Sequence, residues 1–205
     1  MAFKDFKDIA LVMEEFQITY QESDFLQAGE IAVSPLFLDE WNFSQKHLHI
    51  HVSEAAIGEW VLAPILREAY KKHVAQLAFW SHKSIRYDKR LSGAPDYMFA
   101  AKSNLGKVVL GRPLLMMVEA KKNDFDEGWG QCLAELVAAQ KINGKSEVTL
   151  YGLVSDGKSW EFGYLQASQF TKNTKTFQTA NLELLFGALD LVLSLASEQI
   201  KELPA

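Results

Sequence analysis

Hydrophobic positions along the chain follow two spacings, one typical of helices and the other typical of strands. Apolar residues three or four apart predict amphipathic helices that bury one side against a core. This spacing covers residues 6–16, 53–65, about 127–142 and 182–200. Alternating or continuous apolar runs of four to eight residues predict strands. Such runs cover residues 46–52, 77–87, 96–101, 114–121, 148–155 and 159–164.

Residues that begin or end helices support these boundaries. Ser53 can cap the second helix, with the acidic Glu54 in its first turn, and Pro64 is expected to kink that helix. Gly144 follows the third helix, where a left-handed residue commonly ends a helix. The turn at Gly157 joins two of the predicted strands into a hairpin.

The run at residues 114–118 is apolar at every position, as expected of a central strand that is covered on both faces. Helices alternate with strands on either side of it. The chain is therefore predicted to form an α/β fold with a mixed central β-sheet flanked by helices. We find no linker, repeat or low-complexity tract, so residues 1–205 are predicted to form a single domain.

Composition narrows the class of protein further. Hydrophobic residues make up 48% of the 205 residues, enough to bury a core, and the single cysteine, Cys132, excludes an intramolecular disulfide. We expect Cys132 to be a small buried residue of its helix. No apolar run has the roughly 18 residues that a membrane span needs, and the N-terminus has no secretory pattern. We therefore expect a soluble, cytoplasmic protein with no membrane partner.

The net charge of −5 hides an uneven distribution. Residues 71–122 contain 11 Lys and Arg but only three acidic residues, a local charge of +8. This stretch is either a solvated basic surface or a face that meets phosphates. The candidates for contact with a nucleic acid backbone are Lys83, Arg86, Lys89, Arg90, Lys102, Lys107, Arg112 and Lys122.

Three polar residues lie at predicted strand ends. Asp96 begins one strand, while Glu119 and Lys121 end another and project from the same face because they are two residues apart. Two carboxylates on neighbouring strands can bind Mg²⁺, which prefers oxygen ligands and activates a bound water. Lys121 would orient that water or stabilise negative charge. As alternatives, Glu119, Lys121 and Lys122 are a solvated strand exit and Asp96 accepts a turn hydrogen bond.

Four motifs resemble those of the PD-(D/E)XK nuclease superfamily. They are GAPDY at 93–97, VEAKK at 118–122, GQ at 130–131 and GLVSDGKSWEF at 152–162. They are similar in particular to the nuclease domains of type I restriction subunits and to uncharacterised bacterial relatives. The resemblance implies a restriction endonuclease-like fold with a nuclease core at about 53–165, an N-terminal addition at 1–52 and a C-terminal helical addition at 180–201.

The resemblance also implies roles for individual residues. It makes Asp96, Glu119 and the carbonyl of Ala120 metal ligands, makes Lys121 the catalytic lysine, and gives Glu54 an assisting role in metal binding. Gln131 would position DNA or the attacking water. The implied protein hydrolyses DNA with Mg²⁺, for which Mn²⁺ substitutes, and dimers are common in this superfamily. Two departures are that Glu135 stands where a tyrosine often follows the glutamine, and that Glu59 competes with Glu54.

Other hypotheses remain open at this stage. The chain can instead be a nuclease-fold module that binds nucleic acid or a protein partner without cutting. Gln131 can be an ordinary helix-surface residue, and Glu54 can be only a first-turn acid. A third class is a zinc protein, because His47, His49 and His51 would share one face of a strand at 46–52.

Overall fold

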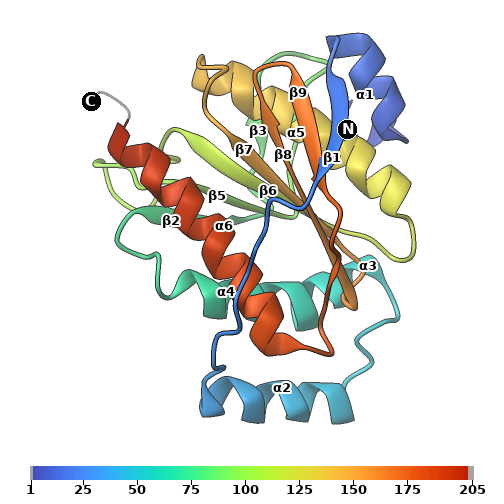
Figure 1. Ribbon diagram of the computed structural model, residues 1–205, viewed down its shortest axis with the longest axis vertical. Helices are drawn as coiled ribbons and strands as arrows, with labels where there is room; N and C mark the ends of the chain where they lie inside the picture. The colour runs from blue at the N-terminus through green and yellow to red at the C-terminus, as the bar shows by residue number, and fades with distance from the viewer. Residues whose placement is uncertain (1, 203–205) are drawn as a thin grey trace.

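A mixed β-sheet of eight strands forms the centre of the fold, as shown by a computed structural model that describes residues 2–202 (Figure 1). Its strands are β1 (Thr19–Ser23), β2 (Leu77–Ser81), β5 (Tyr97–Ala101), β6 (Leu114–Ala120), β7 (Leu150–Ser155), β8 (Ser159–Gln166), β9 (Gln169–Asn173) and β10 (Phe177–Gln178). Their order is β1-β9-β8-β7-β6-β5-β2, and β10 pairs with β8. A separate two-stranded sheet consists of β3 (Ile85–Arg86) and β4 (Ser92–Gly93).

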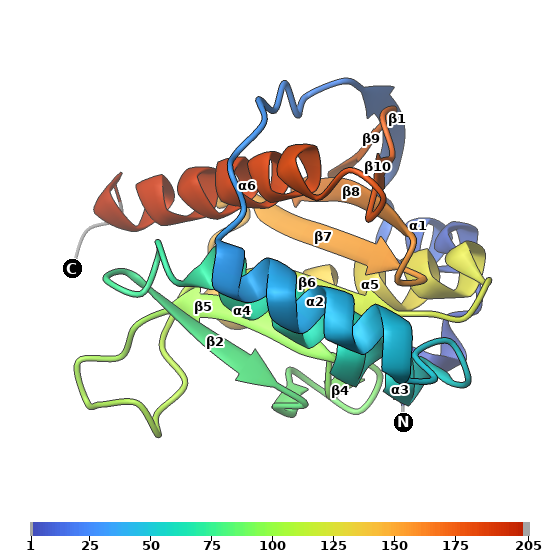
Figure 2. The same cartoon turned by 90° about the horizontal axis from the view of Figure 1, so that it is seen from below.

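Helices cover both faces of this sheet. They are η1 (Ala2–Asp5), α1 (Ile9–Phe16), α2 (Pro35–His47), α3 (Glu54–Ile57), η2 (Gly58–Leu62), α4 (Ala63–Tyr70), α5 (Phe125–Asn143) and α6 (Leu182–Glu202). Helix α5 packs on β6 and β7 with α1 outside it, and α6 packs with α4 on the opposite face (Figures 1 and 2). Helix α2 packs against α6 through Phe37, whose ring meets Phe186 edge-on at 5.3 Å. The predicted α/β class is confirmed.

Strand β6 is the central strand that its unbroken apolar run predicts. It pairs antiparallel with β5 and parallel with β7, and all seven of its residues are buried. Because parallel neighbours need a crossover, α5 connects β6 to β7. The side chain of Asp124 accepts a hydrogen bond from the backbone N–H of Glu127 at 2.9 Å and begins α5, and Gly144 with φ 67° ends it.

The helix predicted from Ser53 is present but changes its winding midway. The Ser53 hydroxyl accepts a hydrogen bond from the N–H of Ala56 at 3.1 Å and caps α3. The following segment η2 is π-helical, and the carbonyl of Gly58 accepts the N–H of Ala63 five residues on. That carbonyl also accepts the hydroxyl of Tyr97, at 2.7 Å. The interruption expected at Pro64 thus lies in the preceding turn, and Pro64 stands in the first turn of α4.

The N-terminal segment lies directly against α5, and a glycine makes this possible. A Cβ at Gly130 would be 2.7 Å from the backbone oxygen of Phe6 and 2.7 Å from the backbone nitrogen of Asp8. Buried core residues therefore extend from Phe3 in η1 to Ala196 in α6. Among the helices between residues 2 and 202, none is long and apolar enough to cross a membrane.

Some predicted elements are wrong. Residues 46–52 do not form a strand, because α2 continues to His47 and is followed by turns in which Ile50 is buried while His49 is exposed. The predicted strand at 77–87 is interrupted after Ser81, since His82 has a positive φ of 47° that ends the extended backbone. The pattern also missed α2, β1, β9 and β10. All five side chains of β1 are exposed, so this strand shows no apolar alternation.

Candidate functional site

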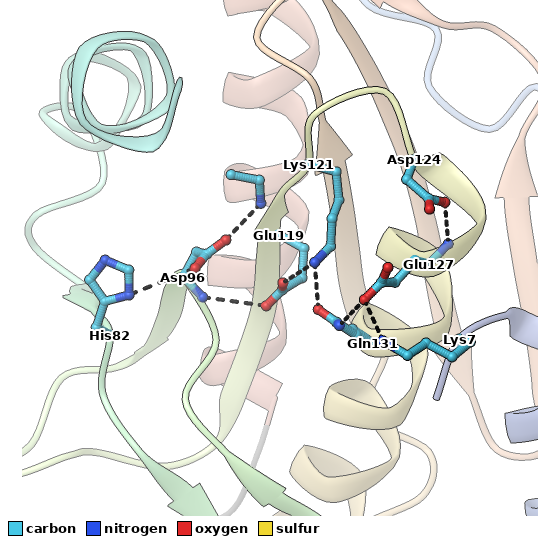
Figure 3. Close-up of polar contacts among 9 residues, drawn as sticks. Lys7, His82, Asp96, Glu119, Lys121, Asp124, Glu127 and Gln131 are labelled. Carbon is cyan, nitrogen blue, oxygen red and sulfur yellow. Dashed lines mark hydrogen bonds and ion pairs between the residues drawn. The ribbon is translucent and has the colours of Figure 1, made fainter. Parts of the chain in front are cut away.

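Asp96 and Glu119 lie opposite each other where β5 begins and β6 ends. Tyr97 pairs with Val118, so the preceding and following residues come together. The backbone N–H of Asp96 donates to Oε1 of Glu119 at 3.4 Å, and the N–H of Ala120 donates to Oδ2 of Asp96 at 2.8 Å (Figure 3). The structure therefore brings both carboxylates to one place on the sheet.

Lys121 completes this group from within the protein interior. Its ammonium donates to Oε1 of Gln131 at 2.7 Å and lies 4.0 Å from Oε2 of Glu119 (Figure 3). Lys121 and Glu119 are each only 5% exposed, and Gln131 is 2% exposed. Lys and Glu are rarely buried unless they are paired. The interpretation of Glu119 and Lys121 as a solvated strand exit is therefore wrong, and so is that of Gln131 as a surface residue.

A series of hydrogen bonds holds Gln131, the acceptor for Lys121, in place. The amide of Gln131 donates to Oε1 of Glu127 at 3.0 Å, and the same oxygen accepts the ammonium of Lys7 at 2.9 Å. Gly128 leaves room for the lysine, because a Cβ there would be 2.9 Å from Cγ of Lys121. The first turns of α5 thus fix the direction of the Lys121 side chain. This fixed direction suits a group that must meet a reacting atom.

Glu135 is a site residue that sequence reasoning assigned only as a departure from the family pattern. It stands one helical turn after Gln131 on the same face of α5 and is 1% exposed. Its Oε2 has no hydrogen-bond partner within residues 2–202. In the sequence, the spacing of four residues between Gln131 and Glu135 indicates that both side chains lie on one face of a helix. A buried carboxyl oxygen without a partner is costly and commonly marks a functional position.

Burial and mutual repulsion raise the pKa values of these carboxyl groups. Burial, with the nearby Asp96 charge, raises the pKa of Glu119 to about 8, while a side-chain hydrogen bond with Glu135 and the charge of Lys121 oppose the change. Burial and then the Glu119 charge raise the pKa of Glu135 well above its usual value. Burial raises the pKa of Asp96, an effect opposed by the N–H of Ala120. The site holds more carboxyl groups than Lys121 can neutralise.

Two adjoining cavities open at this group. One, of about 350 Å³, has Asp96, Glu119, Lys121, Gln131 and Glu135 in its wall. The other, of about 510 Å³, lies between Asp96 and the segment that contains Glu54 and Glu59. Asp96, Glu54 and His82 line both.

Glu54 and His82 both lie near Asp96. The charge of Glu54 contributes to the raised pKa of Asp96. The ring nitrogen Nδ1 of His82 is 3.7 Å from Oδ1 of Asp96. Glu59 lines only the larger cavity, so Glu54 is the better-placed of the two competing acids. The backbone of His82 is left-handed, a conformation that is uncommon for residues other than glycine, and His82 lines both cavities of the site.

The donor set fits a hard divalent cation. Asp96 and Glu119 offer carboxylate oxygens, and the charge of Asp96 adds to burial in raising the pKa of Glu119, a repulsion that a cation would relieve. Within residues 2–202, no three His, Cys, Asp or Glu side chains are arranged to hold a metal ion by themselves. A site of two carboxylates completed by a carbonyl and water suits Mg²⁺, which usually keeps several waters.

The zinc hypothesis fails on geometry. His47 ends α2, while His49 and His51 lie in the turns that follow, so the three rings do not share a strand face. They are not among any three-ligand group in the described part of the chain. Cys132 is buried in α5, as expected.

The eight basic residues divide between the two ends of the sheet. Lys83, Arg86 and Lys89 are exposed in the segment after β2, at the end where Asp96 lies. Lys122 is at the same end, where its ammonium donates to the carbonyl of Val52 at 3.1 Å. The other four basic residues lie at the opposite end of the sheet or are paired within the protein.

Arg90 contacts other parts of the protein. Its guanidinium pairs with Glu15 at 2.8 Å and lies 4.1 Å from the centre of the Phe6 ring. Lys102, Lys107 and Arg112 belong to the connection between β5 and β6, at the end of the sheet away from Asp96. The structure does not bring these three to the site. Arg112 instead donates to the carbonyl of Ile142, near the end of α5, at 3.2 Å.

Comparison with protein-family models finds no match for this chain, and comparison with curated proteins also finds none.

Proposed function

We propose that this chain is a metal-dependent nuclease of the PD-(D/E)XK type that hydrolyses phosphodiester bonds of DNA. The observation that carries the proposal is the convergence of Asp96, Glu119 and Lys121 at neighbouring strand ends, in a wall of a cavity. The order of these residues along the chain and the crossover helix that follows them support a restriction endonuclease-like fold. The exposed Lys83, Arg86 and Lys89 at the same end suit contact with phosphates.

In this proposal, Asp96, Glu119 and the carbonyl of Ala120 hold Mg²⁺, and Glu54 assists from α3. A bound Mg²⁺ lowers the pKa of water and neutralises charge on the attacked phosphate. The other steps belong to the protein. Lys121 orients the attacking water and stabilises the negative charge that develops on phosphate oxygens, while Gln131 keeps its ammonium in that direction.

The reaction itself is a hydrolysis. The water gives up a proton to solvent and its oxygen forms a bond to phosphorus as the bond from phosphorus to the leaving oxygen breaks, and the leaving oxygen takes up a proton from solvent. The side chain of Lys121 is 5% exposed and its ammonium contacts Gln131 and Glu119, so its charge is less screened than a charge in water. Burial of the site thus strengthens the effect of a single lysine.

A cleavage assay tests the proposal. The native protein, Asp96→Asn, Lys121→Ala and the control Lys46→Ala on exposed α2 are incubated with plasmid, linear duplex and single-stranded DNA in Mg²⁺ or Mn²⁺. We expect cleavage by the native protein and the control, and a loss of at least 100-fold in the other two, typical of removing one charge-stabilising group. A native protein that cuts nothing in either metal, or equal cleavage by all four proteins, contradicts the proposal.

A thermal-shift titration separates loss of cleavage from loss of the cation. A ligand that binds only the folded protein raises its melting temperature. Mg²⁺ or Mn²⁺ should stabilise the native protein and Lys121→Ala but not Asp96→Asn. Metal-free nucleic acid binding without any cleavage would favour the alternative of a module that binds without cutting.

A further inference from the structure

The cavity of about 510 Å³ beside Asp96 has a different chemistry from the cavity that contains Lys121. Its wall includes the aromatic rings of Phe79 and Tyr97, which stack on each other with centres 5.7 Å apart and planes 26° apart. Its polar groups include Arg67, Ser81 and Glu59. Its volume is within the roughly 300–1,000 Å³ range of small-molecule sites in proteins.

The charges of this cavity disfavour a phosphate as its occupant. Glu54, Glu59 and Asp96 line it, against Arg67 and the neighbouring His82. An uncharged planar ring is a better match, because nucleic acid bases stack favourably on aromatic rings and on guanidinium planes. Carboxylates accept hydrogen bonds from exocyclic amino groups of bases, and Arg67 can donate to a base carbonyl.

The cavity adjoins the site at which the phosphodiester bond would be cleaved. The two cavities meet at Asp96, Glu54 and His82. A nucleotide with its phosphate at Asp96 and Lys121 would therefore have its base within reach of Phe79 and Arg67. A base inside a continuous duplex cannot enter, since it is stacked and paired, whereas an unpaired base can.

We infer that this cavity, lined by Phe79, Tyr97 and Arg67, binds one unpaired base next to the cleaved phosphate. The inference rests on the proposed nuclease function and deepens it. The substrate class is then single-stranded DNA or the unpaired end or flap of a duplex. A fully paired internal site is a poor substrate, because its base must first be unstacked and unpaired.

The test uses a substitution at an exposed position that places a bulky side chain in the cavity. Ala55 is exposed on α3 and lines this cavity but not the smaller one, so Ala55→Trp occupies the space without replacing a group of the catalytic site. Ala75→Trp, exposed in the turn after α4, is the matched control. Arg67→Ala, at another exposed position, removes a polar wall of the cavity without adding volume.

Two readouts are compared for each protein: Mg²⁺-dependent cleavage, and fluorescence anisotropy with labelled 12-nucleotide single strands and blunt duplexes of about equal length. We expect native protein and Ala75→Trp to prefer the single strand by about tenfold or more, and Ala55→Trp and Arg67→Ala to lose most of that preference. Equal cleavage of paired and unpaired DNA by all variants overturns the inference and leaves the nuclease function in place.

The outcomes also separate the inference from the proposed function. If no protein cuts but anisotropy shows a single-strand preference that Ala55→Trp removes, the nuclease function fails and the base site stands. If no protein cuts and no preference for unpaired DNA exists, both fail. Circular dichroism of each variant confirms that the fold is retained, and Arg67→Ala decides the outcome should Ala55→Trp not fold.

Discussion

Replacing Glu119 by glutamine should make the metal-free protein more stable at neutral pH. The pKa of Glu119 is about 8 in the folded protein against 4.5 for an ordinary glutamate, chiefly because the group is buried. Below pH 4.5 the group is protonated in both the folded and the unfolded chain. As the pH rises from 4.5 to 8, the unfolded chain releases this proton while the folded protein keeps it. Stability is therefore lost across that window.

The size of this loss follows from the two pKa values. One pKa unit corresponds to about 1.4 kcal/mol, so the native protein should lose about 3 kcal/mol between pH 4.5 and pH 7 through this one group. Glu119→Gln keeps the size of the side chain and an oxygen for the N–H of Asp96, but it does not ionise. For a chain of 205 residues the difference is about 6–12 °C in melting temperature.

The assay is thermal or urea unfolding from pH 4.5 to 8 in the presence of a chelator. We expect native protein and the exposed control Glu30→Gln to lose stability with pH, and Glu119→Gln to lose about 3 kcal/mol less. Mg²⁺ or Mn²⁺ should restore the native protein at pH 7 but not Glu119→Gln. Parallel curves for all three proteins would refute the reasoning that a buried, crowded carboxyl group destabilises the fold.

Three further substitutions test other contacts. Gln131→Leu leaves the buried ammonium of Lys121 without its acceptor and should cost about 2–3 kcal/mol in urea unfolding, together with most of the cleavage rate; unchanged stability would show that the contact is replaceable. Tyr97→Phe removes the hydroxyl bound to the carbonyl of Gly58 and should cost about 1 kcal/mol, with no change in the pH dependence of unfolding between pH 4.5 and 8. Leu133→Ala, fully buried in α5, should cost about 2–5 kcal/mol without changing metal affinity in calorimetry.

The sequence predicts much of the site because its main residues are at strand ends. Asp96 after a turn, and Glu119 two residues before Lys121 on an apolar strand, need only the pairing of β5 with β6 to meet. The roles of Gln131 and Glu135 were harder to predict. Helix α5 is buried over most of its length, so its polar residues follow no amphipathic pattern that separates an inner from an outer face.

The errors in the fold have similar physical causes. The alternation at 46–52 suggests a strand, yet Ile50 is the one buried residue of these seven. Residues 46 and 47 belong to a helix whose core contacts, Phe37 and Trp41, precede them. Strand β1 has no buried side chain and is held by backbone pairing with β9. Its position depends on a partner 150 residues later, which a local pattern cannot reveal.

The π-helical turn between α3 and α4 lets Glu54 line the cavity at one end of the helical segment while Ile65 and Leu66 are buried in the core at the other end. Its backbone hydrogen bond joins residues five apart, from Ala63 to Gly58, instead of the four apart of an α-helix, so it contains one extra residue. In an α-helix each residue rotates the chain by roughly 100° about the helix axis, so the extra residue changes which way the following side chains face. Deleting one residue from Gly58–Leu62 would restore continuous α-helical winding. Glu54 could then face the cavity only if Ile65 and Leu66 rotated out of the core. The extra residue thus sets the angle between an acidic end and an apolar end, and one-residue length variation here should be tolerated less than in the exposed loop at residues 104–109.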